Sequence, residues 1–509
     1  MANEVGTANN LEDLFGKIIS FLTTNATLVA ANQEWEALRL RRDNIAAYTT
    51  NLTEQTGTSG APASYRRSIQ TFRYDPRSLN TDDENGSYLA NFYASNFSSG
   101  VSHATWQLRT AREVKTVRLR APLASSHLNY MLRNFRLQYS DDGSTWTTAL
   151  TVNASTVFGL GETKDYAVPG TPGSHLYWRI LMDSVQSGST IVAWMSMLLL
   201  EADGTVANHF GSEAILKARG NAGTEEIYTG IRCEYEAAAG WYNLFLNGYT
   251  GFDPNEQSWF KQPGALNSFG AQYTYAVPMV PCWDTTMPYW FVASGRAFRF
   301  AVKVSTSYEG GYLGFILPYA TPGQFPYPLA VGGSLVPQTS PRSSEWRYSY
   351  ANWRHGCPAG PGIDSYASNE GRWATLYMRN PDGEWGYFGN RGDSNPQPED
   401  IYGPTQSTVA PYAPSGSWRC VWPHAMNDQW TSGKRPYREC LGGGYILQPC
   451  ILMQRAPYSA VFGELEGTYA ISGYANSPEN TTTWNGKTVV VFQHAYRNTV
   501  HEFWAMSLD

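Results

Sequence analysis

LRNFRLQYSDDGSTW, residues 132–146, is the stretch that decides the fold of the region around it. Phe135, Leu137 and Tyr139 alternate with polar residues, which is the period of a strand with one buried and one solvent-facing side. The Asp-Asp-Gly-Ser sequence that follows is typical of a tight turn, and Trp146 opens a returning strand. The stretch therefore predicts a β-hairpin within an antiparallel sheet.

Further strand patterns continue beyond this hairpin. Residues 175–180 (HLYWRI) and 192–195 (VAWM) are rich in aromatic and β-branched residues, and the apolar segment 197–201 (MLLLE) closes the region. A polar, Ser/Thr/Asn-rich segment over residues 46–86 precedes it and is expected to be an extended linker. We therefore expect one β-sandwich over residues 87–202.

The hairpin motif F-x-L-Q-Y-S-D-D-G-S-T-W, the Y-W-R-I strand and the M-L-L-L-E strand together resemble discoidin-type sandwiches, the F5/8 type C or galactose-binding-like family. The resemblance implies a jelly-roll sandwich that binds carbohydrates or lipid headgroups through loops at one end. No ligand residue of that family can be placed on this sequence. Trp106, Tyr130 and Phe158 are candidates for stacking on a sugar, but a core role is favoured because aromatic residues in a sandwich are more often buried.

The composition supports a mainly β, multi-domain protein. The chain has 509 residues, which suggests two to four domains, with 14% aromatic and only 16% charged residues and abundant Gly and Pro. The net charge of −6 provides no field that would attract nucleic acid, and the arginines form solvated faces or interface anchors. No targeting signal and no membrane-spanning run is visible, so we expect a protein that is made in a cytoplasm and not inserted in a membrane. The arginines that we interpret as solvated faces or interface anchors are Arg39, Arg41, Arg42, Arg66 and Arg67.

The N-terminal residues 1–45 are predicted to form a helical arm of two short helices. Asn10 can cap the first and Asn25 the second. The arm either packs on the next domain or docks on a neighbouring subunit, and the sequence favours neither. The apolar residues at helical spacing are Leu11, Leu14, Phe15, Ile18 and Leu22 in the first helix, and Leu28, Trp35 and Leu38 in the second.

Residues 203–509 are predicted to form a larger β-rich domain. Strand patterns occur at residues 241–246, 289–292 and 298–304. The proline-braced loop Gln324–Pro328 is expected to present Phe325 and Tyr327 to another subunit. The expected turns carry Asn247-Gly248, Ser294-Gly295 and Gly310-Gly311.

Three long phrases in and around this domain, at residues 223–252, 287–334 and 464–509, resemble a family of tailed-bacteriophage structural proteins. The N-terminal helices resemble it too. The resemblance implies a virion component of the tail, such as a baseplate, tail-tip, collar or fibre-attachment protein, assembled in the host bacterial cytoplasm. Its partners would be other tail proteins and copies of itself in a symmetric homo-oligomer. The alternative is a receptor-binding, lectin-like virion protein that recognises host glycans through the 87–202 sandwich.

No catalytic, cofactor-binding or metal-binding residues are predicted, and we expect the protein not to be an enzyme; a polysaccharide-degrading enzyme is the least favoured alternative. The histidines form no metal-binding spacing and no nucleophile or phosphate-loop motif occurs. Glu464 and Glu466 are a carboxylate pair but are expected on a solvated strand edge. The six cysteines are expected to be buried thiols, with a Cys440–Cys450 disulfide as an alternative. Asp141-Asp142-Gly143 is interpreted as a turn rather than a calcium loop, and Arg391-Gly392-Asp393 as a chance turn sequence.

Overall fold

A strand buried on both faces reads as a continuous apolar run, and β18 (Met287–Ala293, MPYWFVA) is such a strand. In this computed structural model it belongs to a seven-stranded antiparallel sheet, the central sheet. The strands, in order across it, are β1 (Ala2–Ala8), β18, β19 (Ala297–Val304), β20 (Ser307–Phe315), β22 (Leu329–Gly332), β23 (Leu376–Arg379) and β24 (Trp385–Phe388).

The structure describes most of the chain with gaps. The described residues are 1–54, 92–121, 128–153, 157–186, 190–194, 196–236, 241–256, 258–266, 277–334, 376–388, 418–422, 445–455, 460–484, 486–493 and 503–509. Several positions named from the sequence lie outside them: Arg66, Arg67, Cys357, Arg391-Gly392-Asp393 and Cys440. The fold is mainly β with a short helical segment near the N-terminus, as the sequence predicted.

Two further sheets cover the two faces of the central sheet. Phe291 packs into one core with the inner sheet, while its neighbours Trp290 and Val292 pack into a separate core with the outer sheet. The inner sheet runs in the order β17 (Met279–Cys282), β16 (Trp241–Tyr249), β15 (Ile227–Glu236), β14 (Glu213–Ala218) and β2 (Glu36–Arg41). The outer sheet runs in the order β25 (Trp418–Trp422), β26 (Gln448–Arg455), β27 (Ala460–Ile471), β30 (Phe503–Ser507), β29 (Lys487–Gln493) and β28 (Thr481–Trp484), and β21 (Leu317–Pro318) pairs with β27. The three layers and the first helix form the body.

The N-terminal segment is part of the body rather than an arm. Strand β1 pairs with β18, and α1 (Leu11–Thr24) buries its apolar face in the inner core, where Phe21 contacts Phe291 and Phe298. The second helix, α2, spans only Ala26–Ala30. The prediction that Trp35 and Leu38 belong to it is therefore wrong. Neither helix is long and apolar enough to cross a membrane within the part of the chain that the structure describes.

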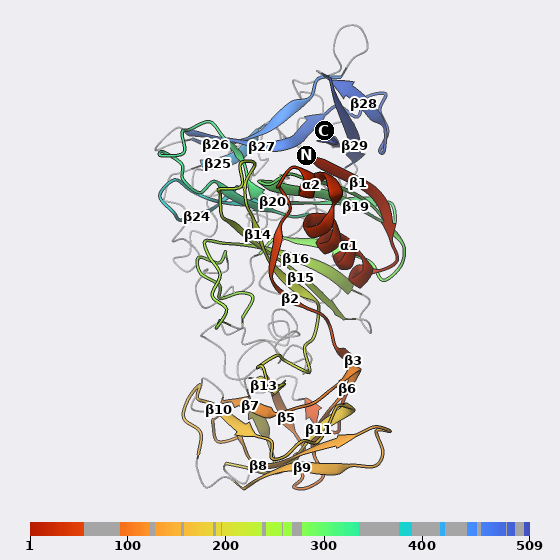
Figure 1. Ribbon diagram of the computed structural model, residues 1–509, viewed down its shortest axis with the longest axis vertical. Helices are drawn as coiled ribbons and strands as arrows, with labels where there is room; N and C mark the ends of the chain where they lie inside the picture. Colours follow the sequence, from red (N-terminus) through yellow and green to blue (C-terminus); the bar gives the residue numbers. More distant parts are fainter. Residues whose placement is uncertain are drawn as a thin grey trace.

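The sandwich is inserted into the body between two paired strands. The chain leaves the inner sheet at Arg41 and returns at Glu213, and these two residues are register partners in the β2–β14 pair. Figure 1 shows the sandwich at one end of the elongated molecule, while both chain termini lie together in the body. The end of the chain is tied to its beginning, because Asn3 Nδ2 donates to the Leu508 carbonyl at 2.8 Å.

The sandwich packs a five-stranded sheet against two three-stranded sheets around its own core. The predicted hairpin is confirmed as β8 and β9, with buried Phe135 and Leu137. The five-stranded sheet runs in the order β3 (Ile45–Thr50), β6 (His103–Arg112), β11 (His175–Val185), β8 (Leu132–Ser140) and β9 (Thr147–Asn153). The smaller sheets are β10 (Thr163–Ala167), β7 (Thr116–Arg120), β13 (Ser196–Leu200), and β12 (Val192–Trp194), β5 (Phe92–Ser95), β4 (Thr53–Glu54).

Two predicted features of the larger domain differ from the structure. Gly248 and Gly311 lie inside β16 and β20 rather than in turns. Glycine suits both positions because a Cβ would meet neighbouring side chains within 3 Å: those of Leu329 and Trp385 at Gly248, and that of Phe300 at Gly311. The predicted turn at Ser294-Gly295 does connect β18 with β19.

The Gln324–Pro328 loop also differs from its prediction. Phe325 is only 2% exposed and packs in the outer core, and the Tyr327 hydroxyl donates to the Tyr249 carbonyl at 2.8 Å. Both rings are therefore used within the chain, and the prediction that this loop presents them to another subunit is wrong. The prolines stiffen a loop that packs on its own body.

The sandwich boundaries lie outside the predicted 87–202. Strands β3 and β4 fall in the predicted linker, but β3 pairs with β6 and β4 pairs with β5. Their sequences are polar because each strand lies at the edge of its sheet. Ile45, Ala207 and Phe210 belong to the sandwich core.

We predict that a fragment of residues 44–210 unfolds cooperatively in urea. A fragment of residues 87–202 should be several kcal/mol less stable, at roughly 1.5–3 kcal/mol for each large side chain uncovered. Equal stability of the two fragments would contradict the extended boundary.

Candidate functional site

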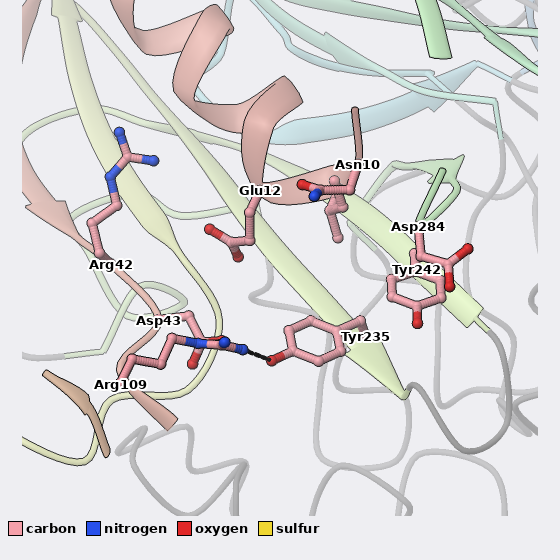
Figure 2. Close-up of a pocket in the computed structure, with 9 residues that line it drawn as sticks. Asn10, Glu12, Arg42, Asp43, Arg109, Tyr235, Tyr242 and Asp284 are labelled. Atoms are coloured by element: carbon pink, nitrogen blue, oxygen red, sulfur yellow. Dashed lines mark hydrogen bonds and ion pairs between the residues drawn. The ribbon is translucent and has the colours of Figure 1, made fainter. Parts of the chain in front are cut away.

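A pocket of about 500 Å³ lies where the sandwich meets the body (Figure 2). It collects side chains from the start of α1, the β2–β3 connection, strands β6, β15 and β16, and the segment after β17. We call it the junction pocket. Its lining residues are Asn10, Leu11, Glu12, Arg42, Asp43, Arg109, Tyr235, Tyr242 and Asp284.

Asp43 is the centre of the polar network in this pocket. Its Oδ2 accepts a hydrogen bond from the Tyr235 hydroxyl at 2.7 Å and from Arg109 Nη2 at 3.2 Å, while Oδ1 accepts from the Ile45 amide at 3.1 Å. Its side chain is 2% exposed, whereas that of Arg109 is 50% exposed. Arg109 therefore neutralises Asp43 and still has surface that a ligand could contact.

Tyr235 keeps its proton over the whole physiological range. Burial, followed by the nearby Asp43 carboxylate, raises the pKa of the Tyr235 hydroxyl well above its ordinary value. The hydroxyl is therefore a permanent donor to Asp43. The Tyr235 ring stacks parallel to Tyr242, with centroids 5.8 Å apart and an interplanar angle of 9°.

Glu12 is held in an unfavourable environment. Asn10 caps α1 by accepting the Asp13 amide at 2.9 Å, which places Glu12 in the first turn beside the pocket. Glu12 Oε2 accepts from the Ser212 hydroxyl at 2.5 Å, but Oε1 is buried without a partner among the described residues. Burial raises the pKa of the Glu12 carboxyl, and the hydrogen bond from Ser212 only partly offsets this.

The open side of the pocket carries groups that are accessible to a ligand. Figure 2 shows Tyr242 and Asp284 on one side of the space and Glu12 above Asp43 and Tyr235. Arg42 points its guanidinium away, over the Phe15 ring at 4.9 Å. A ligand would therefore meet two tyrosine rings, one guanidinium and carboxylates, a set that can both stack on a ring and hydrogen-bond hydroxyls.

The structure places the predicted sugar-stacking candidates elsewhere. Trp106 and Phe158 are 0% and 3% exposed in the sandwich core, which confirms the favoured core interpretation, and Tyr130 is half-buried. Asp142 accepts from the Ser144 and Thr145 amides at 2.7 Å, so the predicted turn is confirmed. Glu464 and Glu466 lie half-buried on β27, and the Glu464 Oε2 accepts from the Tyr319 hydroxyl. Because β27 has paired strands on both sides, the expectation of a solvated strand edge is wrong.

Other predicted positions contribute little to a site. Cys233 and Cys282 are buried thiols whose pKa burial raises. The described residues contain no group of three or more His, Cys, Asp and Glu that could hold a metal ion.

Sequence reasoning did not find the junction pocket. Its members lie up to 274 residues apart, from Asn10 to Asp284, and form no local motif. Tyr235 and Tyr242 lie within one of the phrases that suggested a phage protein, but nothing in their spacing indicated a stacked pair. The pocket exists only because the inserted sandwich brings Arg109 against the body.

Comparison with known proteins finds likeness only in part of the chain. No family model and no curated protein matches it. A family 32 carbohydrate-binding module from Clostridium perfringens, solved with GalNAc-β-1,3-galactose, is 10% identical, covers 30% of this chain and 91% of its own, and has a TM-score of 0.21. An F5/8 type C domain from Bacteroides fragilis is 15% identical, covers 33% of this chain and 96% of its own, and has a TM-score of 0.23. A family 32 module from Streptococcus pneumoniae EndoD is 16% identical, covers 31% and 99%, and has a TM-score of 0.21.

These solved domains are of the discoidin-like type that the sequence resembled. Identities and TM-scores this low carry no argument about a ligand, so the chemistry of the junction pocket has to support any functional proposal. The resemblance to tailed-phage structural proteins stays a prediction.

The strained state of Glu12 gives a stability prediction. A carboxyl with a raised folded-state pKa binds its proton more tightly when folded, so stability falls as pH rises from about 4.5 through the folded pKa. Glu12→Gln keeps an acceptor for Ser212 and removes the buried charge. We expect it to raise the free energy of unfolding at pH 7.5 on the order of 1 kcal/mol, with no gain at pH 4. Urea unfolding at both pH values measures this, and an equal change at both would contradict the assignment.

Proposed function

We propose that this protein binds carbohydrate in the junction pocket, as the glycan-recognising component of a larger assembly. The observation that carries the proposal is the parallel Tyr235–Tyr242 pair in a pocket that also contains an exposed guanidinium and carboxylates. Sugars present apolar C–H faces and rings of hydroxyls. Aromatic rings pack against the C–H faces, and charged groups form hydrogen bonds with the hydroxyls.

The size and charge of the pocket suit a small glycan. Its volume of about 500 Å³ falls within the range of small-molecule sites. Arg109 is already paired with Asp43, so its remaining donors can serve a hydroxyl without a bare charge being buried. Asp284 is exposed and can accept from a second hydroxyl. The proposal needs no catalytic step.

A sugar-binding measurement tests the proposal. The probe is galactose, a monosaccharide with an apolar C–H face and several hydroxyls that is small enough for a pocket of about 500 Å³. We expect calorimetric binding by the full chain and at least a roughly 10-fold weaker affinity for Tyr242→Ala, equivalent to about 1.4 kcal/mol. Tyr474→Ala is the matched control, because Tyr474 is an exposed tyrosine outside the pocket. Absence of galactose binding, or equal loss in both variants, would count against the proposal.

We propose as a second function the assembly of this chain into a larger structure such as a virion tail; an exposed apolar strip on the body supports the assembly itself. Leu317 on β21, Tyr319 directly after it and Val461 on the adjacent strand β27 are 42%, 53% and 49% exposed. Tyr319 is already fixed, since its amide donates to the Phe462 carbonyl and its hydroxyl to Glu464 at 2.8 Å. A pre-ordered aromatic ring loses little entropy when a partner covers it. We propose that this strip contacts another copy or a tail protein.

Replacing the strip should weaken assembly and leave the fold intact. We expect the Leu317→Ser, Tyr319→Ala double variant to shift self-association to higher concentration by about 10-fold or more, because aromatic interface anchors carry much of the binding energy. Its thermal midpoint should stay near wild type, since both side chains are largely exposed. Light scattering across a concentration series gives the measurement. Val29→Ser, at another exposed apolar residue, is the control; identical behaviour of the two variants would argue against the strip.

A further inference from the structure

Asn44 closes the sandwich at the end that faces the body. It follows the last body strand before the insertion, and its side chain is bound to the sandwich side. Its Nδ2 donates to the Ala207 carbonyl at 2.9 Å, and its Oδ1 accepts from the Thr110 amide at 2.8 Å. Its own amide donates to the His209 carbonyl at 2.9 Å. Asn44 therefore ties the outgoing crossing of the chain to the returning one.

Tyr235 is the side chain at which the two hydrophobic cores meet. Its half-buried ring packs against both the body core and the sandwich core. On the sandwich side it contacts Phe210 at 5.0 Å between ring centroids, and on the body side it stacks on Tyr242. Its hydroxyl bonds Asp43, which also binds Arg109 of the sandwich strand β6. The Tyr235 ring and the Asp43 carboxylate thus each contact both units.

The junction pocket uses these same groups. Arg109 comes from the sandwich, while Tyr235, Tyr242 and Asp284 come from the body. A ligand that contacts Arg109 and a body residue at once adds bonds across the junction. Those bonds exist only while both units are folded and in contact, so the ligand favours the state in which both are folded.

We propose that a ligand in the junction pocket bridges the sandwich and the body, so that glycan binding stabilises the two units together; we call this coupling the lock. This inference rests on the proposed function. Because coupling between two equilibria is reciprocal, any change that holds the sandwich in place also raises the affinity of the pocket. The pocket is complete only when the sandwich and the body are both folded and in contact.

Hydrogen exchange of the full chain in mild urea tests the lock. Two peptides report the two units: β11 for the sandwich and β19 for the body. Some amides exchange only when the protein unfolds. A ligand that binds only the folded state slows this exchange by a factor of 1 + [L]/Kd, which is about 10-fold for galactose at ten times its Kd. A ligand bridging the junction requires both units to be folded. We therefore expect galactose to slow exchange in both peptides.

Two arginines of β6 provide the variants. Arg109→Gln removes the sandwich contribution to the pocket; galactose should then still slow exchange in β19 but lose its effect on β11. Arg112→Ala is the matched control, since Arg112 is a half-exposed arginine of the same strand that pairs with Glu201 outside the pocket. In this control, both peptides should slow as in the wild type.

The outcomes separate this inference from the function on which it rests. Binding of galactose with slower exchange in β19 alone, in the wild-type protein, overturns the lock and leaves the proposed function standing. Slower exchange in β11 that survives Arg109→Gln also overturns it, because the bridge would not run through Arg109. Absence of galactose binding overturns both.

Discussion

The pairing of Arg41 with Glu213 is the constraint on which the architecture depends. These residues lie side by side on β2 and β14, and Arg41 Nη1 contacts Glu213 Oε1 at 3.1 Å. Everything between them, the entire sandwich, is an insertion closed by this pair. Long insertions are tolerated because the entropy cost of closing a loop grows only with the logarithm of its length. A sandwich whose own ends lie together makes that cost smaller still.

The chemistry of this closure is unusual, because Glu213 is almost fully buried. Burial alone would raise the pKa of Glu213, but the guanidinium groups of Arg39, Arg41 and Arg232 lower it to about 2. A buried charge of this kind is costly to leave unpaired, and removing one partner of such a pair typically destabilises by about 3–5 kcal/mol. The cluster fixes which strands meet, and therefore where the sandwich leaves the body.

The position of the sandwich then creates the junction pocket. Because β6 ends beside the body, Arg109 reaches Asp43 and Tyr235, and the space left above them is lined from both units. Glu12 is kept there at a cost in stability, with one carboxylate oxygen buried and unpaired. Polar groups held in unfavourable surroundings concentrate at functional sites, which agrees with a binding role for this pocket. The central sheet, covered on both faces, supplies the rigid base.

The sequence by itself determined the local elements: the period-2 pattern of β8, the apolar runs of β18 and β19, and the Asn10 and Asn25 caps all appear as predicted. These features depend on neighbours along the chain, so a short stretch of sequence contains the information. Tertiary structure decided the rest. Gly248 and Gly311 were predicted to lie in turns but lie within strands, where other side chains occupy the place of a Cβ: Leu329 and Trp385 of the central sheet at Gly248, and Phe300 of the adjacent strand at Gly311. Phe325 was predicted to be a surface contact but lies in the core. Glu12, Arg109 and Tyr242 belong to no sequence motif, yet they line the same pocket. Contacts between residues hundreds of positions apart depend on how sheets stack and where an insertion begins, and no local pattern encodes either.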